Sequence, residues 1–130
     1  MKNKLPKIAI LGGGNIGLSL AKGLVKSGKY KAKDIAITRR SRASLDAIKK
    51  LGFTASEKNP SAVAANELIV ICVLPQQLNT VLDEIKPAVD PKKHLLVSVV
   101  SGVTTKDFQQ RLGKQVEVIR GMPNTAIAIG

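Results

Sequence analysis

Three glycines near the start of the chain, Gly12, Gly14 and Gly17, have the spacing of a turn that binds phosphate groups. A short apolar run precedes them at residues 7–11, and apolar residues at helical spacing follow them directly. At such a corner between a strand and a helix, backbone N–H groups and the positive end of the helix face an anion. The first glycine allows a tight turn, the second leaves room for a pyrophosphate, and the third lets the helix approach the strand. The pattern therefore predicts a dinucleotide-binding corner.

Two arginines and a serine, Arg39, Arg40 and Ser41, follow the next predicted strand. In many sheets that bind NAD, an Asp or Glu about 20 residues after the glycines holds the ribose 2′-hydroxyl. Here Thr38 ends that strand, and no acidic residue stands beside it. A carboxylate would repel a 2′-phosphate, whereas a guanidinium binds it through charge-assisted hydrogen bonds. The sequence therefore predicts NADP as the cofactor, with NADPH preferred over NADH.

Further candidate residues follow the other predicted strands at their carboxyl ends, where ligands bind in a doubly wound sheet. Ser101 and Asn124 have side chains that can hydrogen-bond the ribose or the carboxamide of a nicotinamide nucleotide. The other positions expected at these ends are Val73, Leu74, Pro75, Val100, Gly102, Met122, Pro123 and Thr125.

Two residues of types that often take part in catalysis are expected to have other roles. Cys72 falls inside a predicted buried strand, where a free cysteine behaves as a small apolar side chain. His94 precedes a predicted strand at the opposite, amino end of the sheet, and we expect it at the surface. The sequence shows no nucleophile paired with a base and no cluster of metal-ligand residues, so it predicts neither a catalytic residue nor a metal site.

Predicted strands and helices alternate along the chain, which indicates a parallel sheet covered by helices on both faces. With right-handed crossovers the strand order is 3-2-1-4-5-6, that of a Rossmann-type doubly wound α/β fold. We therefore expect residues 1–130 to form one three-layer domain that binds NAD(P). The predicted strands are residues 7–11, 34–38, 53–56, 67–74, 95–100 and 116–120, and the predicted helices lie near residues 14–27, 45–51, 62–65, 78–85 and 104–112.

The composition indicates which kinds of binding partner to expect. The chain carries 21 Lys and Arg and a net charge of +12, but these cations are scattered and aromatic residues are scarce. Proteins that bind single-stranded nucleic acid usually combine cations with aromatic side chains, so we expect no nucleic-acid partner. No apolar stretch approaches the roughly 20 residues of a membrane span, and no signal peptide is visible. With one cysteine, we expect a cytoplasmic protein without a membrane partner.

Four segments together resemble the pyrroline-5-carboxylate reductases: ILGGGNIG at residues 10–17, CVLPQQ at 72–77, VSVVSGVT at 97–104 and VIRGMPNTA at 118–126. Their order and spacing agree over almost the whole chain. The resemblance implies reduction of 1-pyrroline-5-carboxylate to proline, the last step of proline biosynthesis. The reaction it implies is hydride transfer from NAD(P)H to a C=N bond.

The resemblance also implies roles for individual residues. Arg39 and Arg40 would bind the adenosine phosphate, and Asn59 would lie near the adenosine. The residues implied around the pyrophosphate are Leu11, Gly12, Gly13, Gly14, Asn15 and Ile16, and those implied on the nicotinamide side are Val73, Leu74, Pro75, Val99, Ser101 and Asn124.

The chain departs from the family's pattern at Leu74, where a lysine is common, and at Ala126, where a proline is common. Members of the family continue beyond the position of Gly130 into a helical domain, which forms the dimer and completes the imino-acid pocket. We therefore expect this chain to be the cofactor-binding half of such an enzyme. By itself it should bind cofactor with little or no turnover, because the imino-acid substrate and the homo-oligomer depend on the second domain.

Two alternatives remain open from the sequence. One is the nucleotide domain of a deazaflavin-dependent NADP reductase, which looks similar. The other is a module without catalysis that senses a cofactor or binds a partner.

Overall fold

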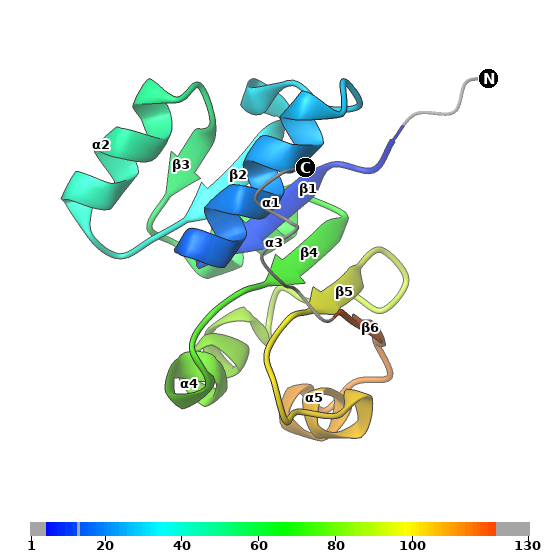
Figure 1. The fold of residues 1–130 in the computed structure, drawn as a ribbon. Helices are drawn as coiled ribbons and strands as arrows, with labels where there is room; N and C mark the ends of the chain where they lie inside the picture. Colours follow the sequence, from blue (N-terminus) through cyan, green and yellow to red (C-terminus); the bar gives the residue numbers. More distant parts are fainter. Residues whose placement is uncertain (1–4, 13, 122–130) are drawn as a thin grey trace.

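The computed structural model describes residues 5–12 and 14–121 of the chain. Six strands form one sheet in the order β3-β2-β1-β4-β5-β6, and all neighbouring strands run parallel. The sequence predicts this order, so the doubly wound α/β architecture is confirmed (Figure 1). The strands are β1 (Ile8–Leu11), β2 (Ile35–Thr38), β3 (Thr54–Ser56), β4 (Leu68–Ile71), β5 (Leu95–Ser98) and β6 (Glu117–Arg120).

Helices cover both faces of the sheet and give the domain its three layers (Figure 1). Each helix connects two strands, because parallel strands need a crossover that returns the chain to the same end of the sheet. A short 3-10 helix, η1 (Ala32–Asp34), precedes β2. The α-helices are α1 (Asn15–Lys26), α2 (Arg42–Lys50), α3 (Asn59–Ala65), α4 (Pro75–Ile85) and α5 (Thr105–Leu112).

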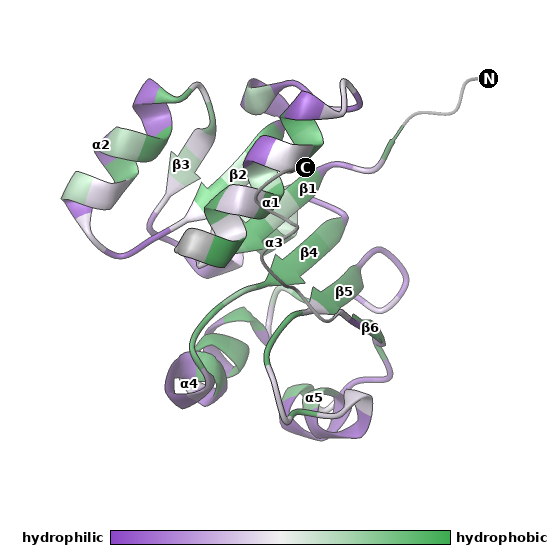
Figure 2. Cartoon of the chain, in the orientation of Figure 1, coloured by the Kyte–Doolittle hydropathy of each residue, from purple (hydrophilic) through white to green (hydrophobic). Residues whose placement is uncertain are grey.

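The central strand β1 contributes alternate side chains to two hydrophobic clusters, because successive residues of a strand point to opposite faces. Ile8 and Ile10 belong to the α1–α2 cluster, which includes Ile48 of α2 and residues of α1. Ala9 and Leu11 belong to the α3–α5 cluster, which contains residues of α3, α4 and α5. None of these four strand residues is more than 3% exposed. Figure 2 shows the result, with the hydrophobic strands β1, β4 and β5 between helices whose residues are mixed.

The fourth strand is shorter than the sequence predicts. Its pattern continues to residue 74, but β4 ends at Ile71. The Cys72 N–H still donates to the Leu11 carbonyl at 2.9 Å, and there the neighbouring strand β1 ends. Pro75 then begins α4 at the first helical position, where its fixed φ is favourable and its missing N–H costs nothing.

The expectation that His94 lies at the surface is wrong. The residue does precede β5 at the amino end of the sheet, but its side chain is only 3% exposed. Its Nδ1 accepts a hydrogen bond from the Asp90 N–H at 2.8 Å, and its Nε2 lies 2.8 Å from the Val63 carbonyl. His94 therefore satisfies buried backbone groups of α3 and of the loop before β5, and its role is structural.

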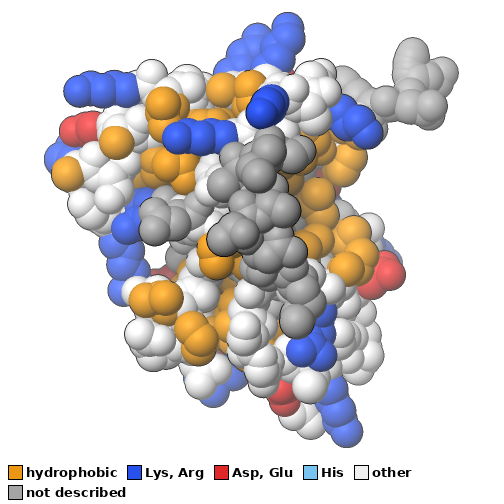
Figure 3. All heavy atoms as spheres, viewed as in Figure 1, with side chains coloured by type: hydrophobic (Ala, Val, Ile, Leu, Met, Phe, Trp, Pro, Cys, Tyr) orange, Lys and Arg blue, Asp and Glu red, His pale blue; other side chains and the backbone are white. Residues whose placement is uncertain are grey.

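Helix ends follow the sequence signals closely. Thr104 and Asp107 form the expected capping box at the start of α5, and Gly113 ends the helix in the left-handed region with φ +66°. No α-helix among the described residues is long and apolar enough to cross a membrane. In the face shown in Figure 3, the Lys and Arg side chains are spread over the surface and form no single patch.

Candidate functional site

The carboxyl ends of the strands meet at one edge of the sheet, because all six strands are parallel. The turn from β1 into α1 lies at this edge, with the segments that follow β2, β4 and β5 beside it. Most of the candidate residues from the sequence lie in these segments. Gly13, Pro123 and Asn124 lie outside the described residues.

Two of the three glycines are required by close packing. Gly12 has φ +86°, and a Cβ there would lie 3.0 Å from Val73 Cγ1 and 3.2 Å from the Cys72 carbonyl oxygen. A Cβ at Gly17 would lie 2.6 Å from the Gly12 carbonyl oxygen and 3.1 Å from Ile10 Cγ2. The turn and the close approach of α1 to β1 therefore depend on glycine at both positions, for the reasons that the fingerprint suggests.

Gly14 differs from the other two, because packing does not require it. Apart from its neighbours in the chain and the backbone of its own helix, a Cβ at this position would come within 4 Å of a single group among the described residues, the Arg39 guanidinium, whose Nη1 would lie 3.4 Å away. Gly14 is the N-cap of the twelve-residue helix α1, and the first turn of that helix has no acidic residue. Uncapped N–H groups, a missing side chain and an adjacent cation together suit a phosphate group.

Thr38 connects this corner to the next strand. Its hydroxyl accepts a hydrogen bond from the Gly12 N–H at 3.1 Å and donates one to Asn59 Oδ1 at 2.6 Å. The Gly12 N–H also lies 3.1 Å from the Thr38 carbonyl oxygen. The side chain is 3% exposed, so this arrangement fixes the Gly12 turn and orients Asn59 from inside the fold.

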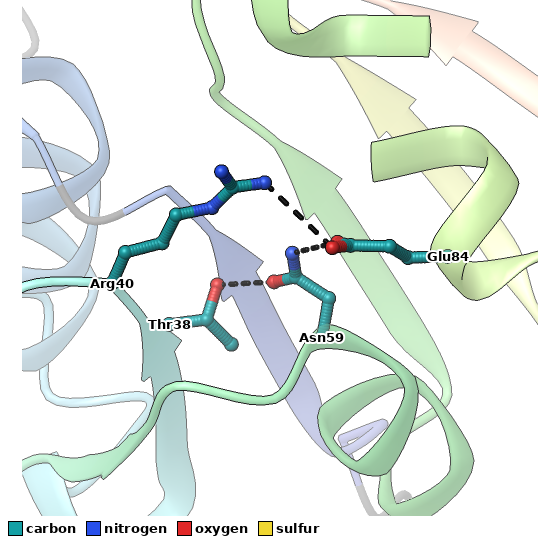
Figure 4. A network of polar contacts seen from close by, with 4 residues as sticks. All are labelled: Thr38, Arg40, Asn59 and Glu84. Carbon is teal, nitrogen blue, oxygen red and sulfur yellow. Dashed lines mark hydrogen bonds and ion pairs between the residues drawn. The ribbon is translucent and has the colours of Figure 1, made fainter. Parts of the chain in front are cut away.

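The network continues from Asn59 to the far side of a pocket. Asn59 Nδ2 donates to Glu84 Oε1 at 3.1 Å, and Glu84 Oε2 lies 3.6 Å from Arg40 Nη2 (Figure 4). Arg40 follows the end of β2, Asn59 is the first residue of α3, and Glu84 lies in the last turn of α4. The pocket has a volume of about 330 Å³ and is lined by Arg40, Glu57, Lys58, Asn59, Pro60, Ser61 and Glu84.

The three residues that follow β2 have separate surroundings. The Arg39 guanidinium lies beside Gly14, and the Arg39 N–H donates to the Ser56 carbonyl at 3.1 Å. Arg40 instead lines the pocket opposite Glu84. Ser41 is the N-cap of α2, and its Oγ accepts from the Ser44 N–H at 3.3 Å. The structure therefore brings one arginine to the glycine corner and the other to the pocket.

Thr38 and Glu84 have no role in the predictions from the sequence, although both belong to this network. Thr38 stands where an acidic residue is common, and its hydroxyl was a signal that another hydrogen-bonding group occupies that place. Glu84 carries no comparable signal, because it lies in the last turn of α4, 25 residues from Asn59 in the sequence.

The other expected residues lie along the remaining part of this edge. Val73 packs beside the Gly12 turn, and Leu74 is 56% exposed. The Val99 N–H donates to the Ile71 carbonyl at 3.2 Å, and Ser101 is exposed just after it. Ile16, in the first turn of α1, is 47% exposed. Apolar and small side chains therefore predominate on this side of the glycine corner.

Cys72 lies at this edge and not inside the strand. Its carbonyl oxygen is next to Gly12, because β4 ends one residue earlier. Its side chain packs against the α1–α2 cluster, as expected of a small apolar residue. Burial raises the pKa of the thiol to about 12, so the reactive thiolate is scarce at neutral pH. The described residues include no group of three or more metal-ligand side chains.

Comparisons with known proteins agree on the kind of protein that this chain resembles. The family model described as "NADP oxidoreductase coenzyme F420-dependent" matches residues 7–102. Pyrroline-5-carboxylate reductase 2 of Dictyostelium discoideum is 41% identical over 92% of this chain and 41% of that protein. Pyrroline-5-carboxylate reductase 1 of the same organism is 40% identical over 92% of this chain and 22% of that protein.

Solved structures that are similar to this chain include pyrroline-5-carboxylate reductases as well. A pyrroline-5-carboxylate reductase from Coxiella burnetii has a TM-score of 0.88 at 32% identity, covering 95% of this chain and 46% of that one. The Plasmodium falciparum enzyme, solved with NADP bound, shares the fold at 23% identity with a TM-score of 0.82, over 97% of this chain and 45% of that one. The chain thus spans less than half the length of these relatives.

Proposed function

Because the chain belongs to the family of NADP oxidoreductases described as coenzyme F420-dependent, and resembles the first half of pyrroline-5-carboxylate reductases, we propose that it is the NADP-binding domain of a reductase that acts on a C=N bond. The observation that carries this proposal is the open glycine corner. A Cβ at Gly14 would enter space that, among the described residues outside its own chain neighbours and helix, the Arg39 guanidinium alone borders. Packing does not explain a glycine there, whereas a bound pyrophosphate does.

In this proposal each segment at the edge of the sheet binds a different part of the cofactor. The Gly12–Gly17 turn and the first turn of α1 would hold the pyrophosphate, with Arg39 beside it. Arg40 and Asn59 line the adjacent pocket and would bind the adenosine ribose and its 2′-phosphate. The segments after β4 and β5 would form the nicotinamide side of the site, with Val73, Leu74, Pro75, Val99 and Ser101 and, beyond the described residues, Pro123 and Asn124.

Cofactor choice follows from charge in this proposal. Arg40 supplies a cation in the pocket proposed for the 2′-phosphate, and the hydroxyl of Thr38 replaces the carboxylate that would repel that phosphate. We therefore propose NADPH as the preferred form.

The chemical step needs more than this edge provides. Bound NADPH would supply the hydride. The protein's part is to position the nicotinamide and the acceptor and to exclude water. The acceptor carbon must be held about 3–3.5 Å from the hydride donor, which requires a pocket closed on more than one side. In this proposal the described residues after β4 and β5 would form one wall of that pocket, where Leu74 is 56% exposed. We propose that the imino acid, 1-pyrroline-5-carboxylate, is held with the help of a helical domain of the kind found in the pyrroline-5-carboxylate reductases, which also forms the homo-oligomer.

The proposal is tested by titrating NADPH into wild type and a Gly14→Val variant, with cofactor fluorescence and calorimetry as readouts. We expect binding to wild type and none to the variant, because the branched side chain occupies the proposed pyrophosphate position. Ala47→Val, on an exposed position of α2, is the matched control and should bind as wild type does. A folded Gly14→Val variant that still binds NADPH would contradict the proposal.

A second candidate function is transfer of a hydride between NADP and a reduced deazaflavin, and the description of the matching family model favours it. The two functions differ in the second substrate. Using the protein expressed from its complete gene, one assay follows NADPH oxidation by 1-pyrroline-5-carboxylate, and the other follows NADP reduction by reduced coenzyme F420. We expect the first to proceed; turnover only in the second would replace the leading proposal.

A further inference from the structure

A carboxylate lies in the pocket where an additional phosphate is proposed to bind. Glu84 Oε1 accepts a hydrogen bond from Asn59 Nδ2 at 3.1 Å, and its Oε2 lies 3.6 Å from Arg40 Nη2 (Figure 4). One carboxylate thus contacts two residues that the proposed function assigns to the adenosine side. A negative charge at this place opposes a nucleotide with an extra phosphate, so Glu84 needs an explanation.

On the premise of the proposed function, we infer that Glu84 sets the degree of preference for a nucleotide with a 2′-phosphate, by holding Arg40 until that phosphate replaces the carboxylate. Carboxylate and phosphate oxygens bind a guanidinium through the same N–H groups. Arg40 therefore exchanges one anion for the other when a 2′-phosphate binds. A nucleotide that has only a 2′-hydroxyl leaves the Arg40–Glu84 pair in place.

The exposure of the pair makes this exchange feasible. The side chains of Arg40 and Glu84 are 64% and 40% exposed, and ion pairs of this kind contribute little net stability in water. A phosphate can therefore replace the carboxylate without a large loss of folding free energy. Arg39 takes no part in the exchange, because its guanidinium lies beside Gly14.

Replacement of Glu84 by Gln separates the charge from the rest of the network. The glutamine carbonyl can still accept the Asn59 hydrogen bond, and Thr38 still fixes the other end of the Asn59 amide. Only the competition for Arg40 and the repulsion of the phosphate are removed. Glu57 provides a comparison for the ion pair, since it places a second carboxylate in the same pocket but has no ion pair in the described part of the chain.

The test is calorimetric titration of adenosine 2′,5′-bisphosphate and of 5′-AMP into wild type, Glu84→Gln, Glu57→Gln, Arg40→Gln and the Arg40→Gln/Glu84→Gln double variant. We expect Glu84→Gln to bind the bisphosphate about threefold or more tighter, the size of an exposed charge interaction, with 5′-AMP changed by less than about twofold. Glu57→Gln should gain less than Glu84→Gln, because it removes repulsion of the phosphate but no competition for Arg40. In the Arg40→Gln background the gain from Glu84→Gln should be clearly smaller, because only the repulsion remains, and in wild type the gain should shrink in high salt.

The outcomes distinguish a wrong inference about Glu84 from a wrong proposed function. If wild type binds both ligands and Glu84→Gln binds the bisphosphate no tighter, the inference is wrong and the proposed function stands. An equal gain in Glu57→Gln, or a gain of undiminished size without Arg40, also overturns the inference, because the effect is then one of general charge and not of the Arg40–Glu84 pair. If wild type binds neither ligand, the proposed function fails and the inference fails with it.

Discussion

Arg39 and Arg40 are adjacent in the sequence but have different partners in the fold. Arg39 lies beside the glycine corner, whereas Arg40 lies across the pocket from Glu84. Both residues follow the end of β2, and their side chains reach different parts of the proposed site from one short segment. The two side chains should therefore affect cofactor binding differently.

We expect wild type to bind NADPH at least about tenfold tighter than NADH, a difference of about 1.4 kcal/mol. Arg40→Ala should remove most of this difference by weakening NADPH alone, because Arg40 lines the pocket proposed for the 2′-phosphate. Arg39→Ala should weaken both cofactors, because Arg39 lies beside the proposed pyrophosphate site. Calorimetric titration with each cofactor measures both effects, and equal affinities of wild type for NADPH and NADH would contradict the role of the arginines.

Thr38 should be the most sensitive of the uncharged residues at this edge. Thr38→Val keeps the shape but removes the hydroxyl that binds both Gly12 and Asn59. We expect a loss of about 1 kcal/mol in the free energy of unfolding, the usual contribution of one such hydrogen bond, together with weaker NADPH binding. Urea unfolding and NADPH titration measure the two effects. Thr38→Ser retains the hydroxyl and should retain NADPH binding, whereas unchanged stability and NADPH binding in Thr38→Val would contradict the role of the hydroxyl.

At the scale of elements, α5 offers a test of the capping box. The Thr104 N–H donates to Asp107 Oδ2 at 2.9 Å, and hydrogen bonds with Thr104 hold the pKa of the Asp107 carboxyl below its usual range. A pKa lowered by folding means that the ionised form stabilises the protein above the pKa of the unfolded chain, about 3.9. This contribution is lost as the pH falls through the lower pKa of the folded state.

Asp107→Asn should therefore unfold at a lower urea concentration than wild type at pH 7, and the difference should become small near pH 3. Asp46→Asn, on the exposed side of α2, is the control and should not show this pH dependence. A destabilisation of Asp107→Asn that stays constant from pH 7 to pH 3 would exclude the charge as its cause.

The elements that depend on local patterns could be predicted from the sequence. Apolar runs mark the strands, and caps such as Gly113 mark the helix ends, so the strand order follows from alternation and handedness. The end of β4 could not be predicted this way, because it depends on where its neighbour β1 stops. The burial of His94 and the position of Glu84 likewise depend on contacts between distant segments.

At the scale of the whole molecule, the proposal separates cofactor binding from turnover. We expect the 130-residue chain to bind NADPH but not to oxidise it detectably with saturating 1-pyrroline-5-carboxylate, because one wall cannot hold the acceptor carbon in place. Loss of NADPH absorbance measures turnover, and light scattering measures the mass of the species present. Turnover at ordinary enzyme rates would show that residues of this chain complete the substrate pocket themselves.

The alternation of β1 between two clusters has a consequence for how mutations combine. Ile10 and Leu11 are covalent neighbours, yet they pack on opposite faces and belong to different clusters. Effects on stability are additive when two sites share no packed partners, and they deviate by about 0.5–3 kcal/mol when the sites are in contact. The destabilisation caused by Ile10→Val and Leu11→Ala should therefore add in the double variant, whereas Ile10→Val and Ile37→Val, which are paired across β1 and β2 in one cluster, should not. Ile10 therefore shares its packing with Ile37 and Val70, residues of other strands, and not with the residue to which it is bonded.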